Sequence, residues 1–184
     1  MFIGREQELK TLNRLYNSNK FEFAVIYGRR RVGKTALIRE FIKNKDVIFF
    51  TGVETNIKQN LDNFSKCIME FNTGLSGDLS FSSFQSALEY VFELSKEKRL
   101  ILVIDEYPYV ARASQSLAST LQFLIDKNKD NSRLFLILCG SSMSYMEDHV
   151  LAYKAPLYGR RTAQMKILPF DFEEENLRRI SDLS

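Results

Sequence analysis

The sequence is poor in the residues that build several common kinds of active site. It has a single histidine, His149, and only two cysteines, Cys67 and Cys139. One histidine argues against a Ser–His–Asp mechanism and against a histidine-rich metal centre. The two cysteines lie far apart, each within an apolar pattern, at a spacing that matches no metal-binding motif. We therefore expect two buried, reduced thiols rather than a disulfide.

Long apolar runs and a strong net charge are missing as well. No stretch approaches the roughly 20 apolar residues of a membrane-spanning helix, and the first residues do not form a basic-then-apolar signal peptide. We therefore expect a cytoplasmic protein with no membrane partner. The formal net charge is only +3, and no basic tract or basic–aromatic stripe argues for a nucleic-acid surface. The 184 residues, 45% hydrophobic and 27% charged, suit one globular domain with a substantial core.

The most informative stretch is GRRRVGKT at residues 28–35. It follows an apolar run, residues 21–27, and opens a helical pattern, which is the context that the phosphate-loop motif G-x-x-x-x-G-K-[ST] requires. The glycines let backbone N–H groups converge on a β-phosphate, and the following helix adds its positive dipole end. We expect Lys34 to reach the β- and γ-phosphates and Thr35 to be a magnesium ligand. The nucleotide-binding residues expected in this loop are Gly28, Arg31, Val32, Gly33, Lys34, Thr35 and Ala36.

Apolar segments of strand length alternate with helical patterns along the whole chain. The expected strands are residues 21–27, 47–53, 100–104, 134–139 and 164–168. A capping box at Asp171 and Glu174 starts a final helix. Strands that are apolar on both faces and separated by helices predict a parallel sheet covered on both sides. The sequence therefore predicts an α/β fold with a doubly wound sheet, in one domain over residues 1–184.

Polar residues follow three of the expected strands at their carboxyl ends, where ligands bind in an open parallel sheet. Gly28 follows the first strand, Asp105 the third and Ser141 the fourth. We expect Asp105 to hold the magnesium through a water and Glu106 to accept a proton from an attacking water. A strand-end acid followed by a glutamate favours hydrolysis over transfer to a second substrate.

The other polar candidates each allow more than one interpretation. A hydroxyl at Ser141 or Ser142 either contacts the γ-phosphate or its attacking water, or caps the next helix. Arg160 and Arg161 follow a glycine in a loop, where an arginine either stabilises the charge of a transition state, in cis or from a neighbour, or is only solvated. The arginines at 29–31 can face phosphate, the acidic groups of a partner, or water, and the sequence does not choose.

Taken together, these motifs resemble those of the archaeal-type P-loop ATPases, a branch of the AAA/STAND-like group. The resemblance covers nearly the whole chain. The triple arginine inside the phosphate loop, together with the motifs at 3–6 (IGRE) and 157–161 (LYGRR), is more particular than the loop itself. The matching segments are residues 2–6 (FIGRE), 27–35 (YGRRRVGKT), 104–108 (IDEYP), 139–142 (CGSS), 157–162 (LYGRRT) and 168–170 (LPF).

The resemblance implies a three-layer P-loop domain whose five-stranded parallel sheet has the order 5-1-4-3-2. It also implies that an N-terminal segment packs against the adenine; its residues are Phe2, Ile3, Gly4 and Arg5. Ser141 or Ser142 would stand at the position of a polar sensor. Arg160 would stand where an arginine finger or a structural arginine is found.

The chain departs from this family at its C-terminal end. Relatives continue into a helical lid, a winged-helix region and often a nuclease-like domain, whereas this chain stops inside the helix expected after Asp171. We therefore expect one ATPase domain, without the lid, winged-helix and C-terminal domains. Lid-borne sensor residues, DNA binding through the missing domains, and contacts with other protomers or with a C-terminal effector domain are left open.

The expected function is magnesium-dependent binding and hydrolysis of ATP, as the motor or switch of a larger protein. The alternative is a nucleotide-gated scaffold that binds ATP or ADP with little turnover, because such switches retain the same motifs. A small-molecule kinase is the weaker interpretation, since neither an acceptor site nor an arginine-rich lid is visible.

We expect Lys34→Ala to abolish nucleotide binding, because it removes the cation that contacts the β- and γ-phosphates. Equilibrium titration with a fluorescent ATP analogue measures this loss. Lys10→Ala, which removes a lysine from the first helical segment, is the matched control. An unchanged dissociation constant for Lys34→Ala would contradict the assignment of the phosphate loop.

Overall fold

The computed structural model describes residues 4–74 and 80–170 of the chain. Two expectations lie outside these residues: the contact of Phe2 and Ile3 with adenine, and the final helix after Asp171. Among the described residues, no helix is long and apolar enough to span a membrane.

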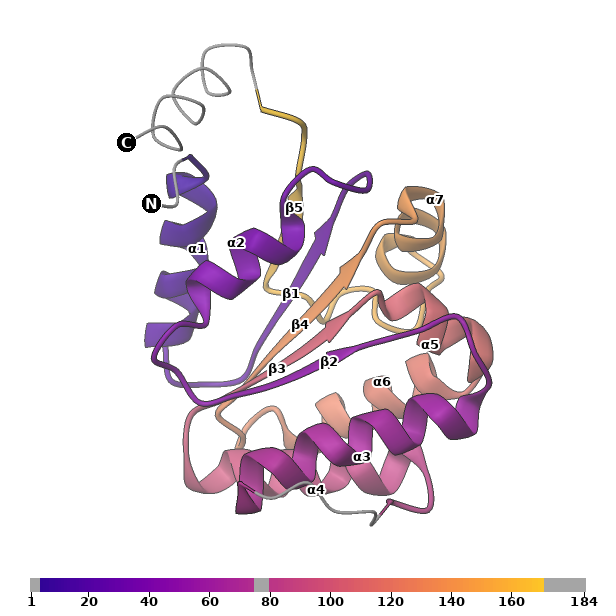
Figure 1. Cartoon of the computed structure of the whole chain (residues 1–184). Helices are drawn as coiled ribbons and strands as arrows, with labels where there is room; N and C mark the ends of the chain where they lie inside the picture. The colour runs from indigo at the N-terminus through magenta and orange to yellow at the C-terminus, as the bar shows by residue number, and fades with distance from the viewer. Residues whose placement is uncertain (1–3, 75–79, 171–184) are drawn as a thin grey trace.

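The centre of the fold is a parallel five-stranded sheet in the order β2-β3-β4-β1-β5 (Figure 1). This confirms the expected α/β fold and the expected strand order, with the fourth strand placed between the first and the third. The strands are β1 (Glu22–Tyr27), β2 (Val47–Thr51), β3 (Leu100–Asp105), β4 (Leu134–Gly140) and β5 (Ala163–Lys166).

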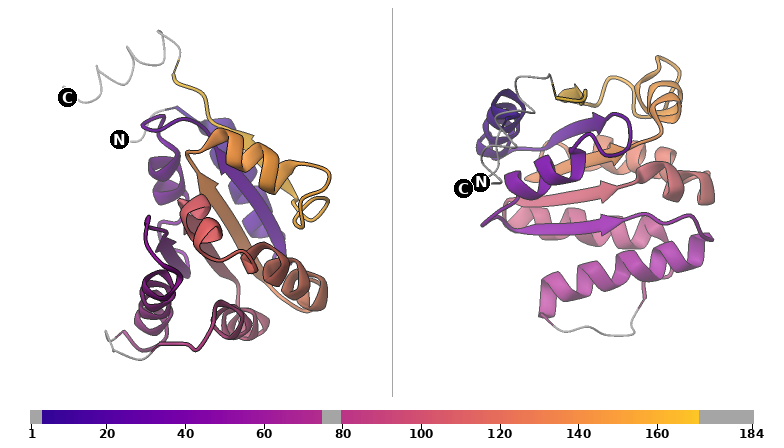
Figure 2. Two further views of the ribbon diagram at one scale, coloured as in Figure 1. Left: turned by 90° about the vertical axis from the view of Figure 1, so that its right-hand side faces the viewer. Right: turned by 45° about the horizontal axis from the view of Figure 1, so that its top comes forward.

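Helices cover both faces of the sheet, which gives three layers. Figure 1 and Figure 2 show α1 (Glu6–Asn17) and α2 (Lys34–Phe41) on one face. The opposite face is covered by α3 (Ile57–Thr73), α4 (Phe84–Glu97) and α6 (Leu117–Asn128). Three short helices lie near the carboxyl ends of the strands: α5 (Tyr107–Ala113), α7 (Met143–Tyr145) and the π-helix η1 (Met146–Leu151).

The core is divided by the sheet because successive side chains of a strand point to opposite faces. In β3, Leu100, Leu102 and Ile104 pack in the cluster that includes α3, α4 and α6. Ile101 and Val103 pack in the cluster that includes α1 and α2. All residues of β1, β3 and β4 are buried, as their apolar runs predict. The buried residues include two acids at strand ends, Glu22 and Asp105.

The strand β2 differs from the expectation in length and in burial. It ends at Thr51 rather than at residue 53. Its first four residues alternate between half-buried and buried, and Thr51 is exposed. Because β2 is an edge strand paired only with β3, Val47 and Phe49 keep one partly open side. The expected sheet with helices on both faces is confirmed, and its edge strand β2 is less buried than β1, β3 and β4.

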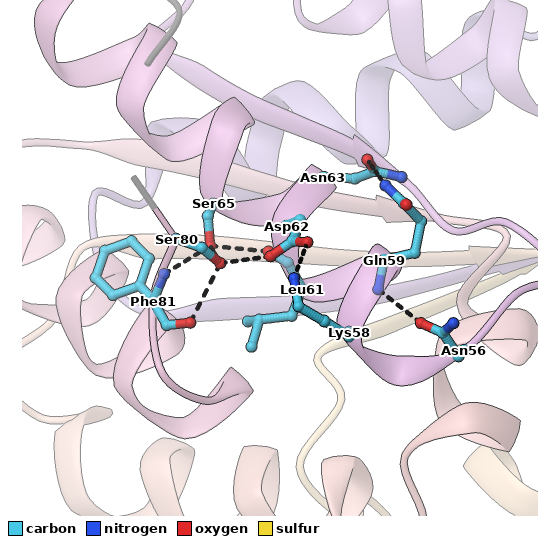
Figure 3. Close-up of polar contacts among 9 residues, drawn as sticks. All are labelled: Asn56, Lys58, Gln59, Leu61, Asp62, Asn63, Ser65, Ser80 and Phe81. Atoms are coloured by element: carbon cyan, nitrogen blue, oxygen red, sulfur yellow. Dashed lines mark hydrogen bonds and ion pairs between the residues drawn. The ribbon is translucent and has the colours of Figure 1, made fainter. Parts of the chain in front are cut away.

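Polar side chains hold the start of α3 and the segment before α4 in place (Figure 3). The Asn56 side chain caps α3 by accepting a hydrogen bond of 2.9 Å from the Gln59 amide. Asp62 accepts hydrogen bonds from Lys58 at 2.7 Å and from Ser80 at 2.8 Å. These two bonds lower the pKa of Asp62.

Arg99, just before β3, joins three segments at the amino end of the sheet. Its guanidinium donates to the carbonyl oxygens of Leu15 and Arg133, each at 2.8 Å, and also to that of Lys20. Partial burial lowers the pKa of Arg99. One side chain therefore satisfies carbonyl groups from the end of α1, the turn before β1, and the entry into β4.

We expect Arg99→Ala to lower the free energy of unfolding by about 2–4 kcal/mol, because three carbonyl groups lose a charged donor. Urea denaturation followed by circular dichroism measures the change. Arg14→Ala, at an exposed position of α1, is the control and should stay within about 0.5 kcal/mol of the parent chain. Equal midpoints for the two variants would contradict the role of Arg99.

Candidate nucleotide site

The phosphate loop lies at the carboxyl end of the sheet, between the end of β1 at Tyr27 and the start of α2 at Lys34. Gly28 stands where the backbone after β5 approaches closely, because a Cβ atom there would lie 2.3 Å from the Ile167 carbonyl oxygen. Gly33 has φ 93°, in the left-handed region, and directly precedes α2. The expected strand, loop and helix are therefore all present, with the N-terminus of α2 facing the loop.

Lys34 is folded back over this loop. Its Nζ donates to the carbonyl oxygens of Gly28 at 2.8 Å and Arg29 at 2.7 Å, and the residue is 5% exposed. A cavity of about 530 Å³ opens beside it. The lining residues are Arg30, Arg31, Gly33, Lys34, Thr35, Ala36, Glu106 and Tyr109. The cavity therefore joins the phosphate loop to the glutamate that follows β3.

Asp105 at the end of β3 lies next to the start of α2. Its Oδ2 accepts a hydrogen bond of 3.0 Å from the Thr35 hydroxyl, and its Oδ1 accepts one of 2.9 Å from the Glu106 amide. Because the hydroxyl donates its hydrogen bond to Asp105, the lone pairs of Thr35 Oγ1 are available to a cation. A hydroxyl and a carboxylate are hard oxygen donors, which suit Mg²⁺.

Asp105 also affects the buried thiol beside it. Burial raises the pKa of Cys139 well above its ordinary value, and the Asp105 charge adds to this effect. Both cysteines are free, as expected, but Cys67 is only partly buried. Among residues 4–74 and 80–170, no three histidine, cysteine or acidic residues gather into a metal site.

Glu106 stands in a strained backbone conformation at the start of α5. Its φ of 51° and ψ of 41° are left-handed, which is unfavourable for a residue with a side chain. The Ser141 hydroxyl lies 3.0 Å from both carboxylate oxygens. Of the two candidate serines, Ser141 thus contacts Glu106, whereas Ser142 accepts a hydrogen bond of 3.3 Å from Arg112.

The described part of the N-terminal segment lies against the phosphate loop. Arg5 approaches the Val32 carbonyl oxygen at 3.5 Å, donates to that of Leu168, and stacks over the Phe170 ring at 4.2 Å. A Cβ atom at Gly4 would lie 2.7 Å from the same ring. Residues 4–5, the loop, and the chain after β5 therefore meet at one place, and the contact with adenine stays a prediction.

The structure does not bring Arg160 together with this site. Its guanidinium binds the Asp126 carboxylate at 2.9 and 2.6 Å and the Pro156 carbonyl oxygen at 3.0 Å. The hydrogen bonds from Arg160 lower the pKa of Asp126. Arg160 precedes β5, and Thr162 pairs with Phe23 near the start of β1. Arg160 thus lies at the amino end of the sheet, opposite the phosphate loop.

The sequence alone predicted no role at the nucleotide cavity for Arg30, Tyr109 or Arg112. The Arg30 guanidinium donates a 2.8 Å hydrogen bond to the Tyr109 hydroxyl, and Arg112 lies one turn further along α5. A signal was available, because Tyr109 and Arg112 follow Glu106 by three and six residues and thus share a helical face. The short helix α5 itself was not expected.

The chain matches known families at both the sequence and the structural level. Residues 2–179 match a family described as an ATPase domain predominantly from Archaea. An uncharacterized protein of Methanocaldococcus jannaschii is 38% identical over 173 residues, which are 94% of this chain and 37% of that protein. An uncharacterized ATP-binding protein of the same organism is 51% identical over 47 residues, which are 26% of this chain and 80% of that protein.

Solved structures share the fold. A Walker-type ATPase of Pyrococcus abyssi superposes with a TM-score of 0.70 at 23% identity, covering 99% of this chain and 59% of that one. The ORC2 protein of Aeropyrum pernix superposes with a TM-score of 0.65 at 20% identity, covering 97% and 52%. The chain thus spans between about a third and three fifths of the length of its long relatives. Because the family match covers nearly every residue, the chain belongs to the family of ATPase domains found predominantly in Archaea.

Proposed function

We propose that this chain binds ATP or ADP with magnesium at the phosphate loop and hydrolyses ATP, as the motor or switch of a larger protein. The observation that carries the proposal is the cavity that joins Lys34 and Thr35 to Glu106. A P-loop alone indicates only a phosphate binder, whereas a glutamate across the same cavity supplies a general base. The ORC2 protein of Aeropyrum pernix, which shares the fold, is known in ADPNP and ADP complexes.

Each residue has a role in this proposal. The loop amides and Lys34 hold the β- and γ-phosphates, and Gly4 and Arg5 lie beside the loop on the side proposed for adenine. Thr35 would hold the Mg²⁺ ion directly and Asp105 would hold it through a water. When bound, the ion neutralises phosphate charge that develops during the reaction.

Hydrolysis requires one water and one base. The water oxygen forms a bond to the γ-phosphorus, the bond from that phosphorus to the bridging oxygen breaks, and ADP leaves. Glu106 takes the proton that the water loses. Ser141 positions Glu106 through the hydrogen bond between their side chains. An arginine for the transition state would have to come from another protomer or from the loop itself, because Arg160 is engaged elsewhere.

The second candidate is a nucleotide-gated scaffold that turns over slowly. The contact between the Ser141 hydroxyl and Glu106 supports it, because a carboxylate oxygen that accepts this bond is partly occupied when an attacking water needs an acceptor.

The proposal also includes contacts with other protomers or with a C-terminal effector domain, and a cytoplasmic location. It includes DNA contact through further domains too: the ORC1 protein of Aeropyrum pernix, which shares the fold, is known in complex with DNA.

We expect Thr35→Ala to lose most of the gain in ATP affinity that Mg²⁺ provides, because one direct oxygen ligand is removed. Calorimetric titration with ATP, once with Mg²⁺ and once with a chelator, measures the gain. Thr35→Ser keeps the hydroxyl and should keep the gain within about threefold, in contrast to about tenfold or more lost by Thr35→Ala. The same gain in both variants would exclude Thr35 as a ligand.

We expect Glu106→Gln to keep ATP binding and to lower phosphate release at least about 100-fold, because the amide cannot accept the proton. A coupled phosphate assay measures release, and Glu93→Gln, at an exposed position of α4, is the control. Equal release by Glu106→Gln and the parent chain would refute Glu106 as the base. Tight binding of ATP without any turnover by the parent chain would favour the scaffold.

A further inference from the structure

A second, smaller cavity adjoins the nucleotide cavity behind Glu106. Its volume is about 200 Å³, and Arg30, Glu106 and Tyr109 line both cavities. Arg112, Ser141 and Ser142 line only the smaller one. We call it the Arg30–Arg112 cavity. The two cavities therefore share Glu106, the proposed base, in their lining.

Two hydrogen bonds form the boundary between the cavities. Arg30 reaches from the phosphate loop to the Tyr109 hydroxyl at 2.8 Å, and Ser141 reaches from the end of β4 to Glu106 at 3.0 Å. Arg30 is exposed at the surface, and its guanidinium has four further N–H groups to offer. An anion that enters between the cavities can therefore accept hydrogen bonds from the Arg30 guanidinium, in place of the neutral Tyr109 hydroxyl.

The charges that line the Arg30–Arg112 cavity favour an oxyanion. The polar lining consists of two guanidinium groups, one carboxylate and three hydroxyl groups, those of Tyr109, Ser141 and Ser142. Arg112 is held in place by the Ser142 hydroxyl at 3.3 Å and by the Tyr145 ring at 4.9 Å. Guanidinium groups bind the oxygens of phosphate in a bidentate way, which makes a pair of them a phosphate site rather than a site for a neutral ligand.

The size of the cavity limits the ligand to a small anion. Its volume of about 200 Å³ lies below the range of roughly 300–1,000 Å³ in which larger ligands bind. The nucleotide therefore belongs in the larger cavity, and a single phosphate group fits the smaller one. Inorganic phosphate is also the anion that hydrolysis would release beside Glu106.

We propose that the Arg30–Arg112 cavity is a subsite for inorganic phosphate, which occupies it after ATP has been cleaved and before it leaves the protein. This inference rests on the proposed function for the origin of the phosphate. The two guanidinium groups outnumber the one carboxylate in the lining, so phosphate meets a net positive charge there.

The test is equilibrium binding of inorganic phosphate to the protein saturated with ADP and Mg²⁺, measured by calorimetry. ADP fills the β-phosphate position of the loop, so the loop itself does not compete. We expect the parent chain to bind phosphate, and Arg112→Gln to weaken this binding about tenfold or more through the loss of charge-assisted hydrogen bonds. Arg112 lines only the small cavity, so phosphate held at the γ-position would not respond to this variant.

Arg14→Gln on α1 is the matched control, because it removes the same charge at an exposed position of another element. It should leave the dissociation constant for phosphate unchanged. Arg112→Lys keeps the charge without the bidentate geometry and should weaken binding less than Arg112→Gln does. If thermal unfolding shows that Arg112→Gln does not fold, Arg112→Lys still decides, since any weakening relative to Arg14→Gln supports the subsite.

The outcomes separate this inference from the proposed function, because the titration needs no turnover. The subsite is overturned if the Arg112 variants bind phosphate as tightly as the parent chain, or if the parent chain does not bind phosphate. Either result holds even if ATP is hydrolysed normally. Phosphate binding that depends on Arg112 in a chain without turnover supports the subsite and refutes hydrolysis as the origin of its ligand.

Discussion

One buried carboxylate, that of Asp105, connects the parts of this molecule that must act together. It accepts hydrogen bonds from Thr35 at the start of α2 and from the Glu106 amide at the start of α5. The phosphate loop and the proposed base are thus joined to the end of β3 through a single side chain. A carboxylate that is 4% exposed needs such partners, because burying an uncompensated charge costs several kcal/mol.

The geometry around Asp105 follows from the parallel sheet. All five strands point the same way, so their carboxyl ends gather the loop after β1, the acids after β3 and Ser141 after β4 at one edge. Only there do the N-termini of helices and the ends of strands meet. The strained backbone of Glu106 fits this picture, since such conformations persist where surrounding contacts hold them and cluster at functional sites.

The parts that were predictable depend on local patterns. The phosphate loop has a fixed spacing between glycines, and Asp105 directly ends an apolar strand, so both could be placed from neighbouring residues alone. Helix α5 escaped prediction because seven residues with a proline near the start carry little periodicity. The shortened edge strand β2 escaped it because an apolar sequence does not tell whether a strand has one neighbour or two.

The sequence by itself determined the fold class, the succession of strands and longer helices along the chain, the phosphate-loop motif, and the acids proposed to bind magnesium and activate water. The sequence also places Arg160 before a parallel strand, and therefore at the end of the sheet opposite the phosphate loop. This position became evident only from the ion pair of Arg160 with Asp126. Tertiary structure alone decided that Ser141 rather than Ser142 contacts Glu106, and that Arg30 reaches Tyr109 beside a second cavity. The reason is physical: these contacts join residues 35 and 79 positions apart, and their distances depend on how strands and helices pack, which no local pattern encodes.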